Sequence, residues 1–196
     1  MEIKVLKKVL AANDKVAVEN KSVFDSEGIT VINLMSSPGS GKTFLLDKTI
    51  GALKKDYGIA VIEGDITTTL DAERLKRHDV PIVQINTSDI GGDCHLEATM
   101  INSALKDIDT KKIDILFIEN VGNLVCPAEF ELGEDHKTVV LSVTEGEDKP
   151  LKYPLMFQVC NWAVISKTDL APILETDMAK LRGYLKQVNP KLEIFE

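Results

Sequence analysis

The residues with the clearest chemical meaning form a glycine-rich run between an apolar segment and a segment of helical period. Gly39 and Gly41 are followed directly by Lys42 and Thr43, as in the phosphate loop of nucleotide-binding proteins. The glycines let backbone N–H groups converge on an anion, and the positive end of the following helix adds to the attraction. We expect Lys42 to neutralise the β and γ phosphates and Thr43 to offer its hydroxyl to Mg²⁺. The expected nucleotide contacts of this run are Ser37, Pro38, Gly39, Ser40, Gly41, Lys42, Thr43 and Phe44.

The run departs from the usual pattern at its first position, where Ser36 stands in place of glycine. An ordinary Gly-rich turn between a strand and a helix is the alternative interpretation. The combination of strand, loop and helix around Lys42 favours the phosphate loop.

Two acidic residues follow predicted strands, where carboxylates that bind a nucleotide's Mg²⁺ are usually placed. Asp65 follows the second apolar run and precedes three threonines, and Glu119 follows the fourth run. We expect Glu119 to contact Mg²⁺ directly or through water, and Asp65 to bind Mg²⁺ and polarise the attacking water. Gly122 is expected to donate its N–H to the γ-phosphate. Either acid alone could be a solvated helix cap, but beside the phosphate loop Lys42, Asp65 and Glu119 become the candidate catalytic residues.

A further part of the expected nucleotide site is Ser166-Lys167-Thr168-Asp169, after a later apolar run. The Asp169 carboxylate can accept hydrogen bonds from both N1–H and the exocyclic amine of guanine, an edge that adenine lacks. The Lys167 stem can lie on the purine face. Guanine-binding proteins commonly have asparagine where this chain has Ser166, which bears on one hydrogen bond rather than on the choice of base. The alternative is that Lys167 and Asp169 are surface residues without a role in binding.

Cysteine and histidine occur at two places that a parallel sheet would bring to one edge. Cys94 and His95 follow the third apolar run, and Cys126 follows the fourth. Two thiolates and an imidazole suit Zn²⁺ or Ni²⁺, and water, Asp93 or a second copy of the chain would complete the site. Simple burial of both thiols, with His95 capping a helix, is the alternative. Because at most ~14 Å of chain separates Cys126 from Gly122, a metal here would respond to the nucleotide.

The other cysteine and histidines carry no such signal. Cys160 precedes a predicted strand and is expected to pack in the core, because free cysteine is commonly buried. His78 and His136 have no thiol or imidazole neighbour and are expected at the surface. An odd number of cysteines, three in all, argues against a disulfide framework.

The periodicity indicates the elements that must position these residues. Short apolar runs alternate with segments in which apolar residues recur three and four apart, which is typical of a parallel sheet covered by helices on both faces. Ligands of such sheets lie at the carboxyl ends of the strands. The predicted strands are residues 29–35, 59–62, 82–85, 113–118, 138–143, 163–165 and 192–195, and the predicted helices are residues 43–55, 69–77, 96–106 and 176–186.

The length of 196 residues is about that of one domain. We expect a nucleotide-binding domain over residues 29–196, with a doubly wound, mostly parallel α/β sheet, and an N-terminal helical extension over residues 1–28. The extension is predicted to break near Asn13-Asp14, where residues that favour turns follow each other. It is expected to pack on the outside of the domain or on a partner chain.

Charge and hydropathy exclude other classes of ligand. Asp and Glu outnumber Lys and Arg by 31 to 23, a net charge of −8, and no basic block interrupts this balance, so we expect no nucleic-acid partner. No apolar run approaches the ~20 residues of a membrane span, and no signal-peptide pattern opens the sequence. We therefore expect a cytoplasmic protein without a membrane partner.

Taken together, these motifs resemble the nickel-insertion GTPases of hydrogenase maturation (HypB-type), which are close to the urease accessory GTPases. The stretches that carry the resemblance are residues 36–43, 63–74, 91–98, 119–127, 144–150 and 166–170. The pairing of Cys94 and His95 with Cys126 is specific to that family. The resemblance implies a SIMIBI-like P-loop NTPase fold and a GTP-driven metallochaperone that slowly hydrolyses GTP to GDP and phosphate. It also implies a Ni²⁺ or Zn²⁺ site at these three residues.

Partners are implied by the same resemblance. They are a second copy of the chain, bound when GTP and metal are present, a small zinc-containing nickel chaperone, and the precursor of the hydrogenase large subunit. Lys149 is implied to contact nucleotide across the dimer. Some relatives carry a Cys-x-x-Cys motif or a His-rich tract before the domain. Residues 1–28 contain neither Cys nor His, so we expect no second nickel site there.

Two other functions stay open at this point. A small-molecule kinase would use the same phosphate loop but usually needs an Arg-rich lid, and Arg74, Arg77 and Arg182 form no cluster in the sequence. A metal-binding adaptor would keep its nucleotide without turnover. Single-turnover hydrolysis of GTP separates these classes from a GTPase.

Overall fold

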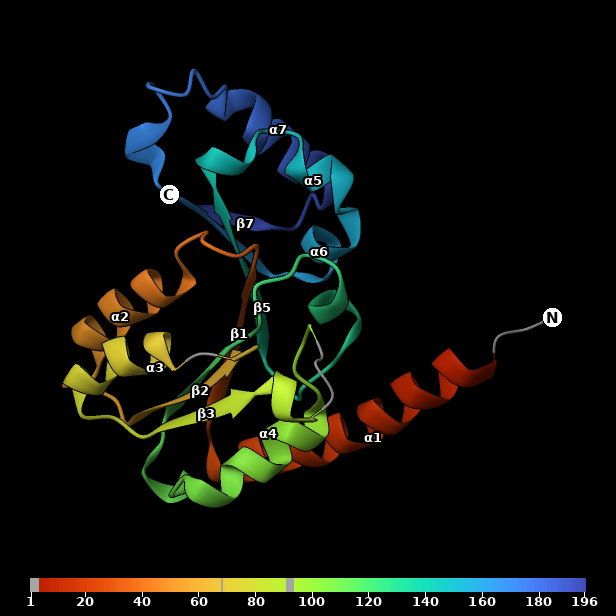
Figure 1. Cartoon of the computed structure of the whole chain (residues 1–196), viewed down its shortest axis with the longest axis vertical. Coiled ribbons are helices and arrows are strands. Elements are labelled where there is room, and N and C mark those ends of the chain that lie inside the picture. The colour runs from red at the N-terminus through yellow and green to blue at the C-terminus, as the bar shows by residue number, and fades with distance from the viewer. Residues whose placement is uncertain (1–3, 68, 91–93) are drawn as a thin grey trace.

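A parallel sheet of seven strands forms the centre of the molecule (Figure 1). The computed structural model describes residues 4–67, 69–90 and 94–196. The strand order is β3-β2-β4-β1-β5-β6-β7, and every described pair is parallel. The strands are β1 (Thr30–Ser36), β2 (Ile59–Asp65), β3 (Ile82–Asn86), β4 (Ile115–Glu119), β5 (His136–Ser142), β6 (Trp162–Ser166) and β7 (Glu193–Phe195). The predicted doubly wound parallel sheet is confirmed.

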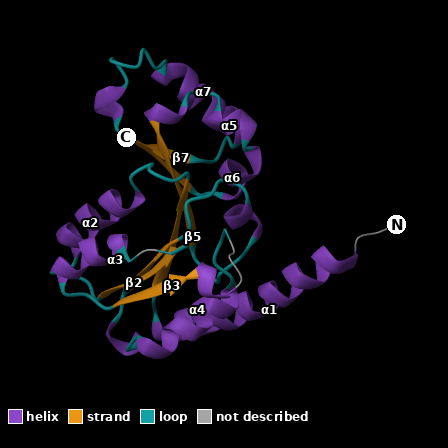
Figure 2. Cartoon of the chain, viewed as in Figure 1, coloured by secondary structure: helices purple, strands orange, loops and turns teal. Residues whose placement is uncertain are grey.

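Helices cover both faces of this sheet (Figure 2). One face packs on α2 and α3 through a cluster that includes Leu46, Leu75 and Phe117. On the opposite face, α1 and α4 pack over one end of the sheet, and α6 and α7 pack over the other end. The helices are α1 (Lys4–Glu27), α2 (Lys42–Leu53), α3 (Leu70–Leu75), α4 (Ala98–Ala104), α5 (Lys149–Lys152), α6 (Pro154–Val159) and α7 (Met178–Val188). Burial on both faces explains why the central strands are apolar throughout.

Helices α5 and α6 are not among the helices predicted from the periodicity. Both are short, with 4 and 6 residues, and Pro150 and Pro154 stand in their first turns. Proline is tolerated there because the N–H groups of the first turn have no partner inside the helix. Such short helices show less than two turns of apolar period, so the pattern alone does not indicate them.

The predicted break near Asn13-Asp14 is wrong, because α1 is one continuous helix across both residues. Asn13 is buried, and its side chain donates to the Glu131 carbonyl at 2.7 Å and accepts from Ala98 N at 2.8 Å. These contacts with other elements outweigh the local preference of asparagine for turns. The described part of α1 thus packs along α4 and supplies Phe24, which is fully buried in the core.

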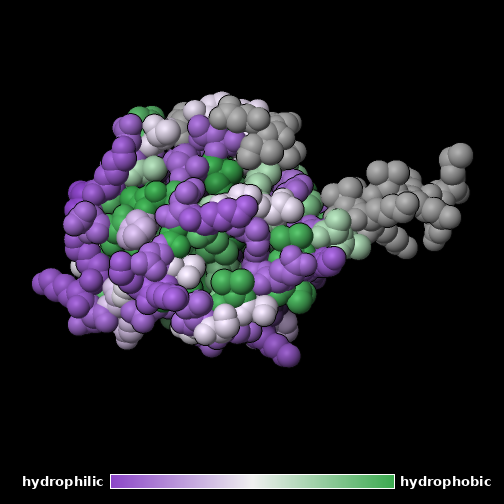
Figure 3. All heavy atoms as spheres, turned by 90° about the horizontal axis from the view of Figure 1, so that it is seen from below, coloured by the Kyte–Doolittle hydropathy of each residue, from purple (hydrophilic) through white to green (hydrophobic). Residues whose placement is uncertain are grey.

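The molecular surface seen from below carries hydrophobic side chains in several separate groups among hydrophilic ones (Figure 3). Within the described part of the chain, no helix combines the length and the apolar character that crossing a membrane requires.

Candidate nucleotide and metal site

A cavity of about 350 Å³ lies at the carboxyl ends of β1, β2 and β4. The glycines of the loop after β1 adopt positive φ angles, 74° at Gly39 and 98° at Gly41, a conformation that costs glycine little. Helix α2 starts at Lys42, directly after this loop. The cavity is lined by Pro38, Gly39, Ser40, Gly41, Lys42, Thr43, Phe44, Glu63, Gly64, Asp65, Ile66, Asp71, Arg74, Glu119, Asn120, Val121 and Gly122. Most of the residues predicted for the phosphate and Mg²⁺ sites therefore meet in one place.

Lys42 is buried at the floor of this cavity, and its Nζ donates to Ser36 Oγ at 2.9 Å. Burial lowers the pKa of the Lys42 ammonium, although the charges of Glu119 and Asp71 act in the opposite direction. Ser36 in turn donates its hydroxyl to the Ser37 carbonyl at 2.6 Å. The serine that departs from the usual pattern thus holds the lysine head beside the loop.

Carboxylates gather next to Lys42. Thr43 Oγ1 donates to Glu119 Oε1 at 2.7 Å. Glu63 and Asp71 join Glu119, and one carboxylate oxygen of each lies within 4.8 Å of the others. Glu63 and Asp71 are not among the predicted site residues. A signal for Glu63 existed, because a charged residue inside an otherwise apolar strand seldom lacks a function or a partner.

The electrostatics of this cluster favour a cation. Burial first, and then the charges of Glu119, Asp65 and Asp71, raise the pKa of Glu63 to about 8. Burial also raises the pKa of Glu119, against the charge of Lys42. Among the described residues, Glu63 Oε2 and Glu119 Oε2 are buried without a hydrogen-bond partner. Because buried oxygens without partners are costly and Mg²⁺ prefers oxygen ligands, the donor set fits Mg²⁺.

Two loops adjoin the phosphate loop. Asp65 ends β2 and lines the cavity, with its Oδ1 accepting from Ile66 N at 2.6 Å. Of the three threonines that follow Asp65, Thr68 lies outside the described residues. A Cβ on Gly122 would come within 3.0 Å of Pro38 Cα. The loop after β4 therefore packs on the phosphate loop so closely that a side chain at position 122 would push Pro38 aside by a few tenths of an ångström.

A second cavity, of about 690 Å³, adjoins the phosphate loop beside β6 and β7. Lys167 Nζ donates to the Gly39 carbonyl at 2.8 Å, and Ser166 Oγ donates to the Ser40 carbonyl at 2.6 Å. Asp169 lines this cavity as well. The structure thus brings the residues predicted to select guanine next to the loop predicted to bind its phosphates.

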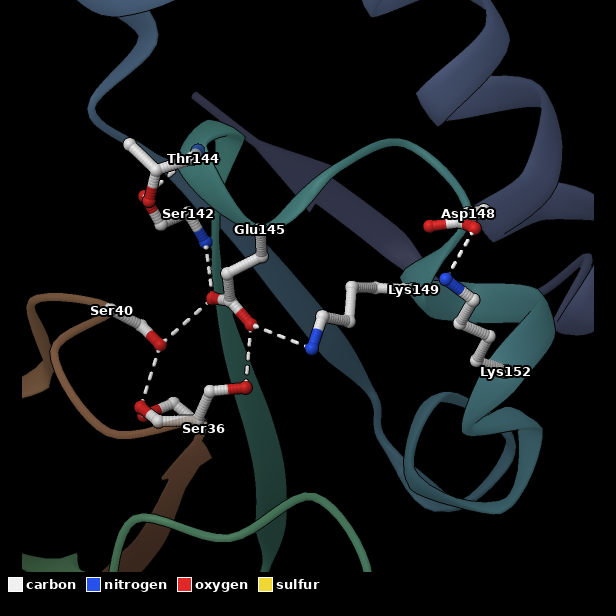
Figure 4. Close-up of polar contacts among 9 residues, drawn as sticks. Ser36, Ser40, Ser142, Thr144, Glu145, Asp148, Lys149 and Lys152 are labelled. Atoms are coloured by element: carbon white, nitrogen blue, oxygen red, sulfur yellow. Dashed lines mark hydrogen bonds and ion pairs between the residues drawn. The ribbon is translucent and has the colours of Figure 1, made fainter.

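The phosphate loop also contacts Glu145, which the sequence analysis did not single out (Figure 4). Glu145 Oε1 accepts from Ser40 Oγ at 2.9 Å, and Oε2 accepts from Ser37 Oγ. Lys149 Nζ lies 4.0 Å from Glu145 Oε2 and over the ring of Tyr153. Lys149 lines neither cavity, so its contact with nucleotide across a dimer stays a prediction.

The predicted metal ligands converge at the same edge of the sheet. Cys94, His95 and Cys126 each offer an atom within 4.8 Å of the others. The two Sγ atoms lie 2.6 Å apart, and Cys94 Sγ lies 4.0 Å from His95 Nδ1. The neighbouring Cys94, and then burial, raise the pKa of the Cys126 thiol. A divalent cation would displace these thiol protons. Asp93, the candidate fourth ligand, lies outside the described residues.

The remaining cysteine and the other two histidines contact protein groups outside the candidate metal site. Cys160 is buried under α6 and α7 as predicted, and burial raises its pKa to about 12. The surface prediction for His78 is wrong, because its ring is buried and Nε2 lies 2.7 Å from Asp47 Oδ1. His136 is half-buried and stacks on Trp162, with the ring centroids 4.2 Å apart.

A glycine-rich loop that joins a parallel strand to a helix beside a buried lysine and carboxylates defines a P-loop nucleotide-binding protein. The family described as CobW/HypB/UreG, nucleotide-binding domain, matches residues 30–196. This chain belongs to the CobW/HypB/UreG family, and within it to the HypB hydrogenase maturation factors.

Relatives from several organisms support this assignment. The hydrogenase maturation factor HypB of Azotobacter vinelandii is 50% identical over 98% of this chain, and this chain spans 62% of that protein's length. The hydrogenase/urease maturation factor HypB of Helicobacter pylori is 43% identical over 99% of this chain and 80% of its own length. The family predicted from the motifs is therefore confirmed.

Solved structures agree in fold. The crystal structure of Helicobacter pylori HypB in complex with nickel has a TM-score of 0.87 and 44% identity, covering 94% of this chain and 85% of that one. HypB of Archaeoglobus fulgidus has a TM-score of 0.87 and 38% identity, covering 94% and 89%. The signal recognition particle receptor FtsY of Elizabethkingia anophelis has a TM-score of 0.60 at 15% identity, over 93% of this chain and 64% of that one. That likeness concerns the fold alone.

Proposed function

We propose that this chain binds and hydrolyses GTP and couples the nucleotide to a nickel or zinc site that serves nickel insertion into hydrogenase. The observation that carries the proposal is the shared position of the two sites. The segment after β4 lines the phosphate cavity with Glu119 and Gly122 and then supplies Cys126 to the metal cluster. A change in one site therefore acts on the same short segment as a change in the other.

In this proposal each residue of the nucleotide site has a separate task. The loop of residues 37–44 surrounds the phosphates, Lys42 neutralises their charge, and Asp169 accepts hydrogen bonds from guanine. Thr43, Asp65 and Glu119 hold Mg²⁺, and Glu63 and Asp71 stand close enough to share in this. When bound, Mg²⁺ neutralises negative charge on the phosphates. Asp65 orients the water that attacks the γ-phosphorus, which releases phosphate and leaves GDP.

Ni²⁺ is the cargo of the proposed metal site, and Zn²⁺ is the other ion that its ligand set suits. Cys94, His95 and Cys126 provide three ligands, so a fourth comes from water or from a second copy of the chain. The close packing of Gly122 on Pro38 supports coupling, because a phosphate loop that adjusts to its nucleotide also displaces Gly122. Cys126 follows only four residues later.

The partners are also part of the proposal. The chain dimerises when GTP and metal are bound, with Lys149 reaching the partner's nucleotide. It works in the cytoplasm beside a small zinc-containing nickel chaperone, and it serves the precursor of the hydrogenase large subunit. The names of its relatives as hydrogenase maturation factors, and the nickel complex of the Helicobacter pylori protein, support this setting.

Single-turnover hydrolysis of GTP with Mg²⁺, followed by equilibrium titration with Ni²⁺, tests the proposal. We expect one phosphate released for each GTP bound, and Ni²⁺ binding at the thiol site. Lys42→Ala should abolish nucleotide binding while the circular dichroism spectrum stays unchanged. Tight binding of GTP without phosphate release would indicate an adaptor, and transfer of phosphate to a metabolite would indicate a kinase. Either result would contradict the proposed hydrolysis.

A further inference from the structure

We propose that Glu145 is a positioning residue of the phosphate loop. Its carboxylate fixes the hydroxyls of Ser37 and Ser40 and so holds the loop in the shape that receives the nucleotide's phosphates. This inference rests on the proposed nucleotide binding at the loop, and it adds a residue from outside the loop motif to that site.

The direction of the Glu145 side chain is set by local structure. Ser142 ends β5 and caps the following turn, residues Val143–Glu145, by accepting from Thr144 N at 3.2 Å. Glu145 Oε1 in return accepts from Ser142 N at 3.0 Å, which completes a capping box. Because β5 lies beside β1 in the sheet, the fixed carboxylate faces the loop after β1 (Figure 4).

The contacts with the loop are long-range in sequence and shielded from water. Ser40 Oγ lies 2.9 Å from Glu145 Oε1, and Ser37 Oγ donates to Oε2, across 105 and 108 residues of sequence. The Ser40 residue is 1% exposed and the Glu145 side chain 12% exposed. Hydroxyl groups that donate to an ionised carboxylate form stronger hydrogen bonds than neutral pairs do. The Ser40 hydroxyl also lies 2.7 Å from the Ser37 carbonyl, so its one proton is shared between two acceptors, whereas within the described chain the Ser37 hydroxyl donates to Glu145 alone.

The same loop is held at its carbonyls by a different element. Ser166, the last residue of β6, and Lys167, which follows it, donate to the carbonyls of Ser40 and Gly39. Neighbouring elements thus fix the loop at two hydroxyls and two carbonyls, and within the loop Ser40 N donates to the Ser37 carbonyl at 3.4 Å. A loop held in this way can present its other backbone N–H groups to an anion. Preorganised donors of this kind bind without a further cost of ordering.

The negative charge of Glu145 argues for positioning and against direct binding of phosphate. A carboxylate would repel an anion, so it cannot itself attract the nucleotide. Its charge is met by the donors already named and by Lys149 Nζ at 4.0 Å. The alternative role is that Glu145 only stabilises the turn after β5, and the following experiment separates the two roles.

The test measures the equilibrium affinity and the release rate of GDP in the presence of Mg²⁺. Glu145→Ala is expected to raise the Kd about tenfold, mainly through faster release, because it frees the Ser37 hydroxyl and leaves the Ser40 hydroxyl only the Ser37 carbonyl as acceptor. Glu145→Gln keeps an acceptor oxygen at the same reach and should recover most of the affinity. Asp148→Ala is the matched control, because Asp148 lies in the same segment but its carboxylate pairs with Lys152 at 2.6 Å and not with the phosphate loop (Figure 4).

A double-mutant cycle gives the readout that a purely structural role would not produce. In a chain that carries Ser37→Ala and Ser40→Ala, the further change Glu145→Ala should alter GDP release less than twofold, because its partners are already gone. An equal effect of Glu145→Ala with and without the serines would overturn the proposal, as would an unchanged Kd in the single variant.

Two further outcomes are distinguishable. Should Glu145→Ala fail to fold, the double serine variant leaves the capping box intact, and unchanged GDP release in that variant would overturn the proposal. Failure of the wild-type chain to bind GDP, or retained GDP binding in Lys42→Ala, would instead overturn the proposed nucleotide function.

Discussion

The three cysteines differ in the residues that surround them. Cys126 lies with Cys94 and His95, whereas Cys160 is buried among apolar side chains. We expect Cys126→Ala to weaken Ni²⁺ binding by more than about tenfold, because it removes a direct ligand. Cys160→Ala is the matched control and should keep the Ni²⁺ affinity. Isothermal titration with Ni²⁺ measures both, and an unchanged Ni²⁺ affinity in Cys126→Ala would show that the ligand assignment is wrong.

The buried carboxylate of Glu63 gives a second prediction for a single residue. Glu63→Gln removes one ionisable carboxyl group, which a bound cation would ionise, from the acidic cluster at the phosphate cavity. We expect the Mg²⁺ concentration needed for tight GDP binding to rise about tenfold, because fewer charged oxygen ligands remain for the cation. GDP binding without Mg²⁺ should change much less. If GDP binding depends on Mg²⁺ equally in the variant and in the wild type, Glu63 is not a ligand of the cation.

A site residue can be predicted from the sequence when the residues that it contacts are close to it in the chain. Lys42 and Thr43 are recognisable because their motif is contiguous, and the structure places them at the predicted cavity. The contact between Glu145 and Ser40 spans 105 residues, so no spacing rule indicates it. Glu63 stands out as a charged residue in an apolar strand, but the sequence does not show that Asp71 and Glu119 lie beside it. Contacts of this kind arise from the order of the strands in the sheet.

Among the elements, α1 depends on polar contacts that oppose its local sequence preference. Asn20 donates to the carbonyls of Ala98 and Leu132 and accepts from Asn102. Asn20→Ala should therefore lower the free energy of unfolding by about 2 kcal/mol, since it leaves buried groups without partners. Exposed Glu19→Ala on the same helix should change it by less than about 0.5 kcal/mol. Urea unfolding compares the two, and equal effects would contradict this role for Asn20.

The contact between α2 and the turn after α3 is expected to weaken in acid. Burial alone would raise the pKa of Asp47, but hydrogen bonds from His78 and Arg77 outweigh it and hold the pKa below the usual 3.8. A lowered folded-state pKa contributes stability above the unfolded pKa, and this contribution is lost as pH falls through the folded value. The wild type should thus lose stability below about pH 4 more steeply than Asp47→Asn. Urea unfolding between pH 3 and 6 tests this, and parallel curves would contradict it.

The sequence predicts the strands better than the helices, and the reason is physical. The strands, which are buried on both faces, stand out as continuous apolar runs, and each predicted strand is present. The short α5 and α6 show too little period, and the continuity of α1 across Asn13 depends on tertiary contacts. Local patterns therefore identify the sheet better than the helices that cover it.

At the scale of the whole molecule, the chain is acidic, and only a few neighbouring groups make its candidate site attractive to an anion. The net charge is −8, yet the phosphate loop offers backbone N–H groups at glycines with positive φ and one buried lysine. The parallel topology then brings the loops after β2, β3 and β4 to the edge where that lysine lies. This arrangement places a nucleotide site and a candidate metal site on connected loops, which is the basis for coupling between them.

The most direct test of this coupling is the Ni²⁺ affinity of the wild-type chain, measured once with GDP and once with a non-hydrolysable GTP analogue, both with Mg²⁺. Coupled sites typically change each other's affinity by about 5- to 150-fold, and the effect is reciprocal. We predict a difference in Kd within this range, lost in Cys126→Ala. The same Ni²⁺ affinity with both nucleotides would contradict the account.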